Sequence, residues 1–166
     1  MSEGLTIAVE GAERDDVRAL LDAAWSWSAA LYPPESRHGL DLAAYAQSEV
    51  TLFVAREGGV ALGCGAYQLQ GGDNAEIKSM FVVPEAQGRG IGRAILAAIE
   101  DALRGRVGTL RLETGIEQPA AIRLYEGAGF GRRGPFGSYC DDPLSIFMEK
   151  PLQHPVRHGP PPAPAD

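Results

Sequence analysis

Hydrophobic and polar residues alternate along parts of this chain and recur at intervals of three and four along others. Alternation predicts β-strands, because successive side chains of a strand point to opposite faces, whereas intervals of three and four predict an apolar stripe on a helix. The predicted strands are 5–10, 50–57, 60–70, 75–83, 107–115, 129–133 and 143–150. The predicted helices are 12–32, 92–105 and 118–129, with a short one at 40–47.

Turn residues between these segments indicate how the strands are connected. Gly58-Gly59 and Gly71-Gly72-Asp73 separate three consecutive strands by short turns, which predicts an antiparallel meander. The strand–helix–strand order across 74–114 instead predicts a right-handed crossover and one parallel pair. We therefore expect an α/β (α+β) domain with a mixed sheet at 1–152, followed by a proline-rich disordered tail at 153–166.

Composition and net charge argue against some classes of binding partner for this domain. The 166 residues carry a formal net charge of −7, which argues against nucleic acid or an anionic membrane surface as a partner. Apolar runs stay well short of the roughly 20 residues that a membrane-spanning helix needs. Cys64 and Cys140 are far apart and match no metal-ligand spacing, so we expect free thiols in a reducing cytoplasm and no metal.

A glycine-rich turn between a predicted strand and a predicted helix is the strongest candidate for a binding site. It reads QGRGIGR, residues 87–93. Glycines and the unpaired N–H groups of a helix N-terminus together favour a phosphate. The spacing fits neither a Walker A loop nor G-x-G-x-x-G, although Glu113, at the end of a later strand, keeps a dinucleotide open as an alternative. A tight turn without a ligand is the other alternative.

Two segments in this order resemble the GNAT superfamily of acetyl-CoA-dependent N-acetyltransferases. Residues 87–92 match its Q/R-x-x-G-x-G/A signature, and residues 121–130, AIRLYEGAGF, are similar to its A-x-x-L-Y-x-x-x-G-F segment. The resemblance covers roughly residues 5 to 150. It implies a GNAT fold, with about six to seven mostly antiparallel strands, a central splayed parallel pair and about four flanking helices. It also implies an enzyme that often dimerises.

The resemblance further implies which residues bind acetyl-CoA and its product, coenzyme A. Backbone amides of the glycine turn would contact the pyrophosphate, and the strand before it would pair with the pantetheine arm, with the parallel pair splayed to admit it. Gln118 stands where many members carry Asn. The implied coenzyme-binding residues are Met80, Phe81, Val82, Val83, Gln87, Gly88, Arg89, Gly90, Ile91, Gly92, Arg93, Gln118, Ala121 and Tyr125.

Acetyl transfer to an amine needs a base, a stabilised oxyanion and an acid for the departing thiolate. The resemblance implies Tyr125 as the acid, and a strand glutamate such as Glu76 as the base. A backbone N–H near Met80 to Val82 would stabilise the oxyanion. Lys78 shares a strand face with Glu76 if the strand is regular, and so either pairs with it or binds a substrate carboxylate.

Two polar loops, 32–41 and 135–143, are expected to line the acceptor side. Their mixed charges favour a small polar molecule with a primary amine as acceptor. The substrate candidates are Tyr32, Ser36, Arg37, His38, Lys78 and Tyr139, of which His38 is also an alternative base. A non-catalytic acyl-CoA-binding module and a protein-lysine or N-terminal acetyltransferase remain alternative functions.

Overall fold

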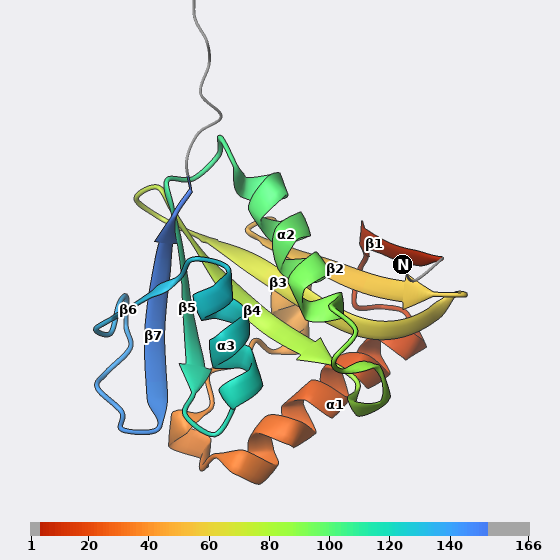
Figure 1. Cartoon of the computed structure of the whole chain (residues 1–166), viewed down its shortest axis with the longest axis horizontal. Coiled ribbons are helices and arrows are strands. Elements are labelled where there is room, and N and C mark those ends of the chain that lie inside the picture. The colour runs from red at the N-terminus through yellow and green to blue at the C-terminus, as the bar shows by residue number, and fades with distance from the viewer. Residues whose placement is uncertain (1–3, 153–166) are drawn as a thin grey trace, which may run out of the picture.

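One mixed sheet of seven strands forms the centre of the computed structural model, which describes residues 4–152 (Figure 1). The strands are β1 (Leu5–Val9), β2 (Val50–Glu57), β3 (Val60–Gln70), β4 (Asn74–Val82), β5 (Thr109–Gly115), β6 (Gly131–Arg133) and β7 (Ser145–Pro151). The helices are α1 (Asp15–Leu31), α2 (Ile91–Leu103) and α3 (Pro119–Gly127), with 3₁₀ turns η1 (Pro34–Ser36), η2 (Leu42–Ala46) and η3 (Pro84–Ala86).

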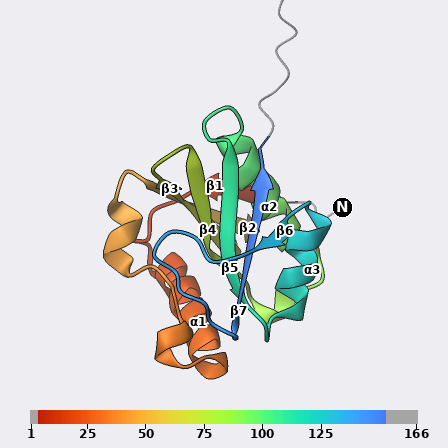
Figure 2. The same cartoon turned by 90° about the vertical axis from the view of Figure 1, so that its left-hand side faces the viewer.

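The strands are ordered β1-β2-β3-β4-β5-β7-β6, so that β7 lies between β5 and β6 (Figure 2). All neighbours are antiparallel except β4 and β5. The predicted meander and parallel pair are therefore confirmed, as is the mixed fold class. The helix count is slightly lower than expected, because segment 40–47 forms a 3₁₀ turn capped by the Asp41 carboxylate rather than an α-helix.

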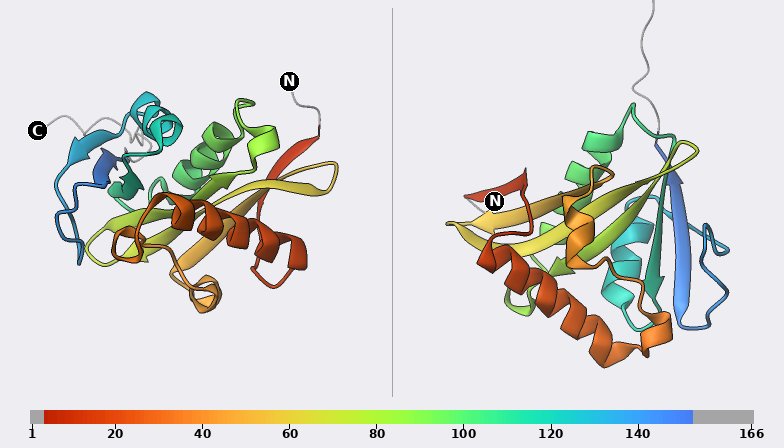
Figure 3. Two further views of the ribbon diagram at one scale, coloured as in Figure 1. Left: turned by 90° about the horizontal axis from the view of Figure 1, so that it is seen from below. Right: turned by 180° about the vertical axis from the view of Figure 1, so that it is seen from behind.

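Helices cover both faces of the sheet, with α1 on one side and α2 and α3 on the other (Figure 3). The alternation along β2 explains this division: Phe53 and Ala55 belong to the core under α2, whereas Leu52 and Val54 belong to the core under α1. The buried stripe of α2 therefore packs against one face of the sheet and that of α1 against the other.

The parallel strands β4 and β5 pair only at their first residues and then separate. Their register runs from Asn74 opposite Thr109 to Glu76 opposite Arg111, and ends there. Further along β4, Ser79 and Met80 stand opposite the single residue Gly65 of β3, which is a β-bulge. Ser79 has a φ of 59°, which is rare for a residue with a side chain.

Gly65 makes this bulge possible. A Cβ atom at that position would lie 2.4 Å from the sulfur of Met80 and 2.7 Å from Ile95. The β3 backbone can therefore approach β4 and α2 this closely only without a side chain. The bulge turns β4 away from β5, and the gap that results is where the candidate site lies.

The remaining predictions about the fold concern the C-terminal tail, membrane-spanning helices and the two cysteines. The tail at 153–166 lies outside the described residues. Within residues 4–152, no helix has the length and hydrophobicity that crossing a membrane requires. Cys64 is buried and Cys140 is exposed, and both are free thiols, as the sequence predicted. The compartment itself stays a prediction.

Candidate active site

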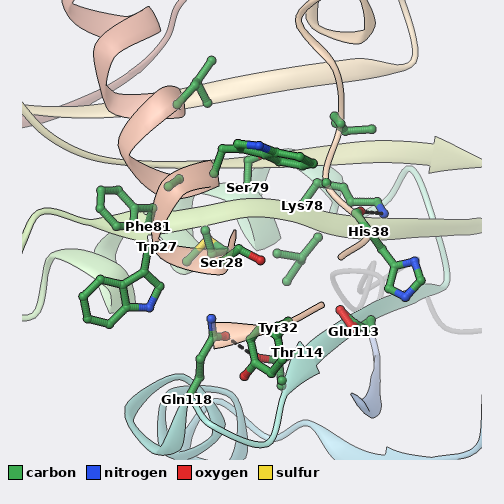
Figure 4. Close-up of a pocket in the computed structure, with 18 of the residues that line it drawn as sticks. Trp27, Ser28, Tyr32, His38, Lys78, Ser79, Phe81, Glu113, Thr114 and Gln118 are labelled. Atoms are coloured by element: carbon green, nitrogen blue, oxygen red, sulfur yellow. Dashed lines mark hydrogen bonds between the residues drawn. The ribbon is translucent and has the colours of Figure 1, made fainter. Parts of the chain in front are cut away.

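A cavity of about 450 Å³ opens where β4 and β5 separate (Figure 4). Its walls come from α1, the segment between α1 and β2, strands β4 and β5, the start of α3 and the loop before β7. It brings together many of the predicted residues, which are Tyr32, Ser36, His38, Glu76, Lys78, Met80, Phe81, Gln118, Tyr125 and Tyr139. The loops and strands that the sequence assigned to one site therefore do meet.

Glu76 lies in this wall as part of a dense polar cluster. Its side chain is buried, and its carboxylate accepts a 2.5 Å hydrogen bond from the Tyr139 hydroxyl. It also forms an ion pair of 2.9 Å with Lys78. Lys78 in turn donates to the Tyr139 hydroxyl at 2.7 Å and to the carbonyl oxygen of His38 at 3.1 Å. The pairing of Lys78 with Glu76, one of the two roles predicted for that lysine, is thus present in the structure.

Glu113 faces the same side of the sheet as Glu76, because Glu76 pairs with Arg111 and Glu113 stands two residues further along β5. Its carboxylate accepts a 3.1 Å hydrogen bond from the Ser145 hydroxyl. Burial raises the pKa of Glu113 to about 7, against the lowering effects of Ser145 and Lys78. A carboxylate with this pKa is divided between its charged and neutral forms near neutral pH.

Tyr125 reaches the cavity from the opposite side of the sheet. It belongs to α3 and to the core under α2, where its ring packs edge-on against Phe130 at 5.8 Å between centroids. Burial, and secondarily the charge of Glu113, raise the pKa of the Tyr125 phenol above its usual range. Because Glu113 faces the α1 side, the cavity passes through the sheet between the separated strands.

The glycine turn has the form of an anion site at the start of α2. Gly88 and Gly90 have φ of 80° and 82°, and a Cβ atom at either would meet nothing within 4 Å. The first N–H groups of α2, which begins at Ile91, have no acceptor within the helix. Gln87 donates a side-chain hydrogen bond to the Val82 carbonyl at 3.1 Å, and Arg89 pairs with Glu57. Gln87, Gly88, Arg89 and Gly90 are exposed and lie outside the lining of the cavity.

The remaining predicted residues have different surroundings. The Tyr32 hydroxyl accepts a 3.0 Å hydrogen bond from the Glu117 backbone, and Ser36 donates to Asp142 at 2.5 Å. Gln118, at the start of α3, accepts a 3.0 Å hydrogen bond from Thr114. Outside the lining of the cavity are Arg37, Val82, Val83, Ala121 and the glycine turn from Gln87 to Arg93. Of these, Val82, Val83 and Ala121 pack against the core under α2.

Several lining residues were not predicted from the sequence. Glu113 was considered only for a dinucleotide, and Trp25 and Trp27 only as parts of a helix. Ser79 lines the cavity at the bulge, where its hydroxyl shares a 2.6 Å hydrogen bond with that of Tyr45. One sequence signal was available for Glu113, since polar and apolar residues alternate along LRLETG and place Glu113 on the same strand face as Arg111.

Comparison with known proteins gives a consistent result. Residues 15–130 match the family model described as the acetyltransferase (GNAT) family. The chain is 46% identical over 150 residues to an IAA acetyltransferase of Azospirillum brasilense, which covers 89% of this chain and 98% of that protein.

Solved structures agree with this match. A protein of Klebsiella pneumoniae described as an acyl-CoA N-acyltransferase has a TM-score of 0.75 at 37% identity, over 89% of this chain and 97% of that one. The PaiA N-acetyltransferase of Thermoplasma acidophilum, solved in complex with coenzyme A, has a TM-score of 0.71 at 19% identity, over 89% of this chain and 99% of that one. This last likeness concerns the fold alone.

Proposed function

The chain belongs to the acetyltransferase (GNAT) family, and from this premise we propose that it transfers an acetyl group from acetyl-CoA directly to the primary amine of a small molecule. We further propose Glu113 as the base and Tyr125 as the acid. The observation that carries this proposal is that both side chains line one cavity at the separation of β4 and β5, although they come from opposite faces of the sheet.

The glycine turn fits the phosphates of coenzyme A. Gly88 and Gly90 leave the loop surface open, and the start of α2 presents unpaired N–H groups and a partial positive charge. The backbone of Met80 to Val83 lies on the side of β4 that β5 leaves free, where an extended pantetheine arm can add like a strand. Bound acetyl-CoA supplies the thioester carbonyl that the amine attacks.

Glu113 suits the role of base better than Glu76, the residue expected from the sequence. Glu76 is held by both Lys78 and Tyr139, so its carboxylate is already engaged within the protein and is less free to meet a substrate ammonium. Within residues 4–152, Glu113 has one side-chain hydrogen-bond donor, Ser145, and its pKa near 7 matches the pH at which a general base is most effective. Glu113 takes the proton that the bound ammonium loses.

Tyr125 keeps its proton until negative charge develops beside it. The raised pKa of the phenol makes it a weak acid in the resting site, so it remains neutral at physiological pH. A departing thiolate creates charge close to this hydroxyl, which then donates its hydrogen bond and its proton. The low exposure of Tyr125 excludes the water that would otherwise weaken this interaction.

The oxyanion is assigned to a backbone N–H near Met80 to Val82, as the sequence resemblance implied. The bulge at Ser79 supports this assignment, because it interrupts the regular pairing of β4 with β3 just before these residues. A backbone group fixed by a bulge contributes stabilisation without any reorganisation during the reaction.

Release of free thiol from acetyl-CoA in the presence of amines tests the proposal, with thermal shift by coenzyme A as the measure of donor binding. We expect Glu113→Gln to lower kcat at least about 100-fold with coenzyme A binding retained. Glu76→Gln is the matched comparison, and we expect a smaller loss from it. If Glu113→Gln kept the parental activity and Glu76→Gln lost it, the base would be Glu76 and not Glu113. Absence of any coenzyme A binding would overturn the function as a whole.

A further inference from the structure

Both tryptophans of the 166-residue chain line the active-site cavity. They lie on α1, and Trp25 and Trp27 are 50% and 46% exposed. Large apolar side chains that stay half exposed on a concave surface are typical of a binding site, because their burial awaits a ligand. The sequence pattern had assigned them to a helix and not to the site.

Trp25 is held in a fixed position by the loop that follows α1. A Cβ atom on Gly39 would lie 3.0 Å from the Trp25 ring, so the loop backbone packs directly against it. The Arg37 guanidinium stacks on the same indole, 5.5 Å from its centroid. A ring fixed in this way forms a flat wall without the entropic cost of ordering a mobile side chain on binding.

Further apolar side chains continue this wall. Leu42 is 45% exposed and lines the same cavity, together with Tyr45 and Phe81. Figure 4 draws Trp27 and Phe81 at one end of the cavity and Glu113 and His38 at the other. The cavity thus joins an aromatic end to a polar end that holds Glu113.

Charge along the cavity favours a cation. Four carboxylates line it, from Asp22, Asp41, Glu76 and Glu113, against the basic side chains of Lys78 and His38. Lys78 is already paired with Glu76 at 2.9 Å, so its charge is largely compensated. An ammonium group that enters the cavity therefore meets carboxylates that Lys78 does not compensate, among them Glu113, where the reaction needs it.

We propose that the acceptor is a small primary amine with an aromatic body, whose ring rests against Trp25 while its amino group reaches Glu113. The proposal rests on the proposed function and makes its acceptor more specific. It replaces the polar acceptor expected from the loop charges, because the cavity adds an apolar wall from α1 that the loops alone do not reveal. Aromatic contacts supply binding energy, and the carboxylate orients the amine.

A panel of four amines with acetyl-CoA tests this class directly. The probes are 2-phenylethylamine and tryptamine, with n-butylamine and spermidine as the non-aromatic comparison. We expect kcat/KM for the aromatic amines to exceed that for n-butylamine by about five- to tenfold, the ratio that one aromatic contact of about 1–1.4 kcal/mol gives. We expect Trp25→Ala to remove most of this preference while it leaves the KM for acetyl-CoA within about twofold. Val60→Ala is the control, because Val60 is 59% exposed and does not line the cavity.

Binding without turnover gives a second measurement. Both tryptophans lie in the cavity, so 2-phenylethylamine should change the intrinsic fluorescence of the protein. The single-tryptophan variants Trp27→Phe and Trp25→Phe, which keep an aromatic ring, then report on Trp25 and Trp27 separately. We expect the larger change from Trp25, whose ring makes the proposed contact.

The outcomes separate this proposal from the one on which it rests. If coenzyme A binds but no amine of the panel is acetylated, and 2-phenylethylamine still changes the fluorescence, the proposed function fails while the aromatic site stands. If amines are acetylated without preference for an aromatic body, or if Trp25→Ala leaves the preference unchanged, the aromatic site is wrong. Faster acetylation of a peptide that begins with phenylalanine than of 2-phenylethylamine would overturn the small-molecule acceptor.

Discussion

The Tyr139 hydroxyl donates a 2.5 Å hydrogen bond to the Glu76 carboxylate and joins the loop before β7 to strand β4. The same hydroxyl accepts a 2.7 Å hydrogen bond from Lys78, and the Tyr139 ring packs edge-on against His38 at 5.0 Å. One side chain therefore holds together the two loops that close the acceptor side. Burial, and the charge of Glu76, raise the pKa of the Tyr139 phenol above its usual range, so it stays a donor at neutral pH.

Replacing Tyr139 by Phe should weaken this side of the site without removing its catalytic groups. Glu76 stays buried and loses one donor, which should lower the free energy of unfolding by about 1–2 kcal/mol. We expect the KM for the acceptor to rise several-fold with the KM for acetyl-CoA little changed. Tyr67→Phe is the matched control, since Tyr67 also loses a hydrogen bond, from Arg106, but does not line the cavity. An equal change of both KM values in Tyr139→Phe would contradict the positioning role.

The pH dependence of the reaction should report Glu113. A base must be deprotonated to act, and the pKa of Glu113 is about 7. We therefore expect kcat/KM to fall as the pH drops through about 7, with a second limb set by the acceptor amine at higher pH. Glu76→Gln should keep the limb near pH 7, and Glu113→Gln should lose it. A limb near pH 7 that survives in Glu113→Gln would show that another group titrates there.

Stability should change with pH in the opposite direction to activity. Burial raises the pKa of Glu113 from 4.5 to about 7 in the folded protein, so folding favours the protonated form. This group therefore destabilises the fold progressively as the pH rises from about 4.5 through 7. Glu113→Gln is neutral at every pH, and should equal the parent at pH 4.5 but exceed it at pH 8 by up to about 3 kcal/mol. Chemical denaturation at several pH values measures the difference.

The effect of Glu113→Gln on stability distinguishes the proposed catalytic role of Glu113 from a structural one, because burial of the charged carboxylate destabilises the fold. If Glu113 were held for structural reasons alone, its replacement would lower stability at pH 8. Ser145→Ala is the useful companion variant, because it removes the hydrogen bond that lowers the pKa of Glu113. The acid limb of the rate profile should then move to higher pH.

The local parts of this site could be predicted from the sequence. The alternation along β4 places Glu76 and Lys78 on one face, and the structure pairs them as that spacing suggests. The strand, glycine turn and helix at 74–103 are likewise local, and the turn has the positive φ angles that its glycines allow. Residues a few positions apart within one element are related by geometry that the sequence itself contains.

The contacts between distant segments could not be predicted in this way. Tyr139 stands 63 residues after Glu76, and no periodicity relates a loop residue to a strand so far before it. Glu113 was missed because its face of β5 becomes a cavity wall only where β4 turns away, and that turn depends on the bulge at Ser79. Trp25 and Trp27 were missed because helical spacing shows which residues are buried, and not which half-exposed residues adjoin a cavity.

The glycine turn gives the last prediction. Gly88 and Gly90 have left-handed backbone conformations, so a substitution there can be tested separately for its effect on stability and for its effect on coenzyme binding. Gly90 has a φ of 82° immediately before α2, and alanine in that conformation costs about 1–2 kcal/mol. We expect Gly90→Ala to lower stability by about that amount and to raise the KM for acetyl-CoA at least several-fold, because the strained turn shifts the N–H groups that we propose to bind phosphate. Gly127→Ala is the control: Gly127 ends α3, is not among the glycines with positive φ, and has open space around its Cβ position. That variant should be neutral or more stable, with an unchanged KM, as alanine favours a helix over glycine. If Gly90→Ala lowered stability but left the KM for acetyl-CoA unchanged, the turn would serve the fold and not the coenzyme.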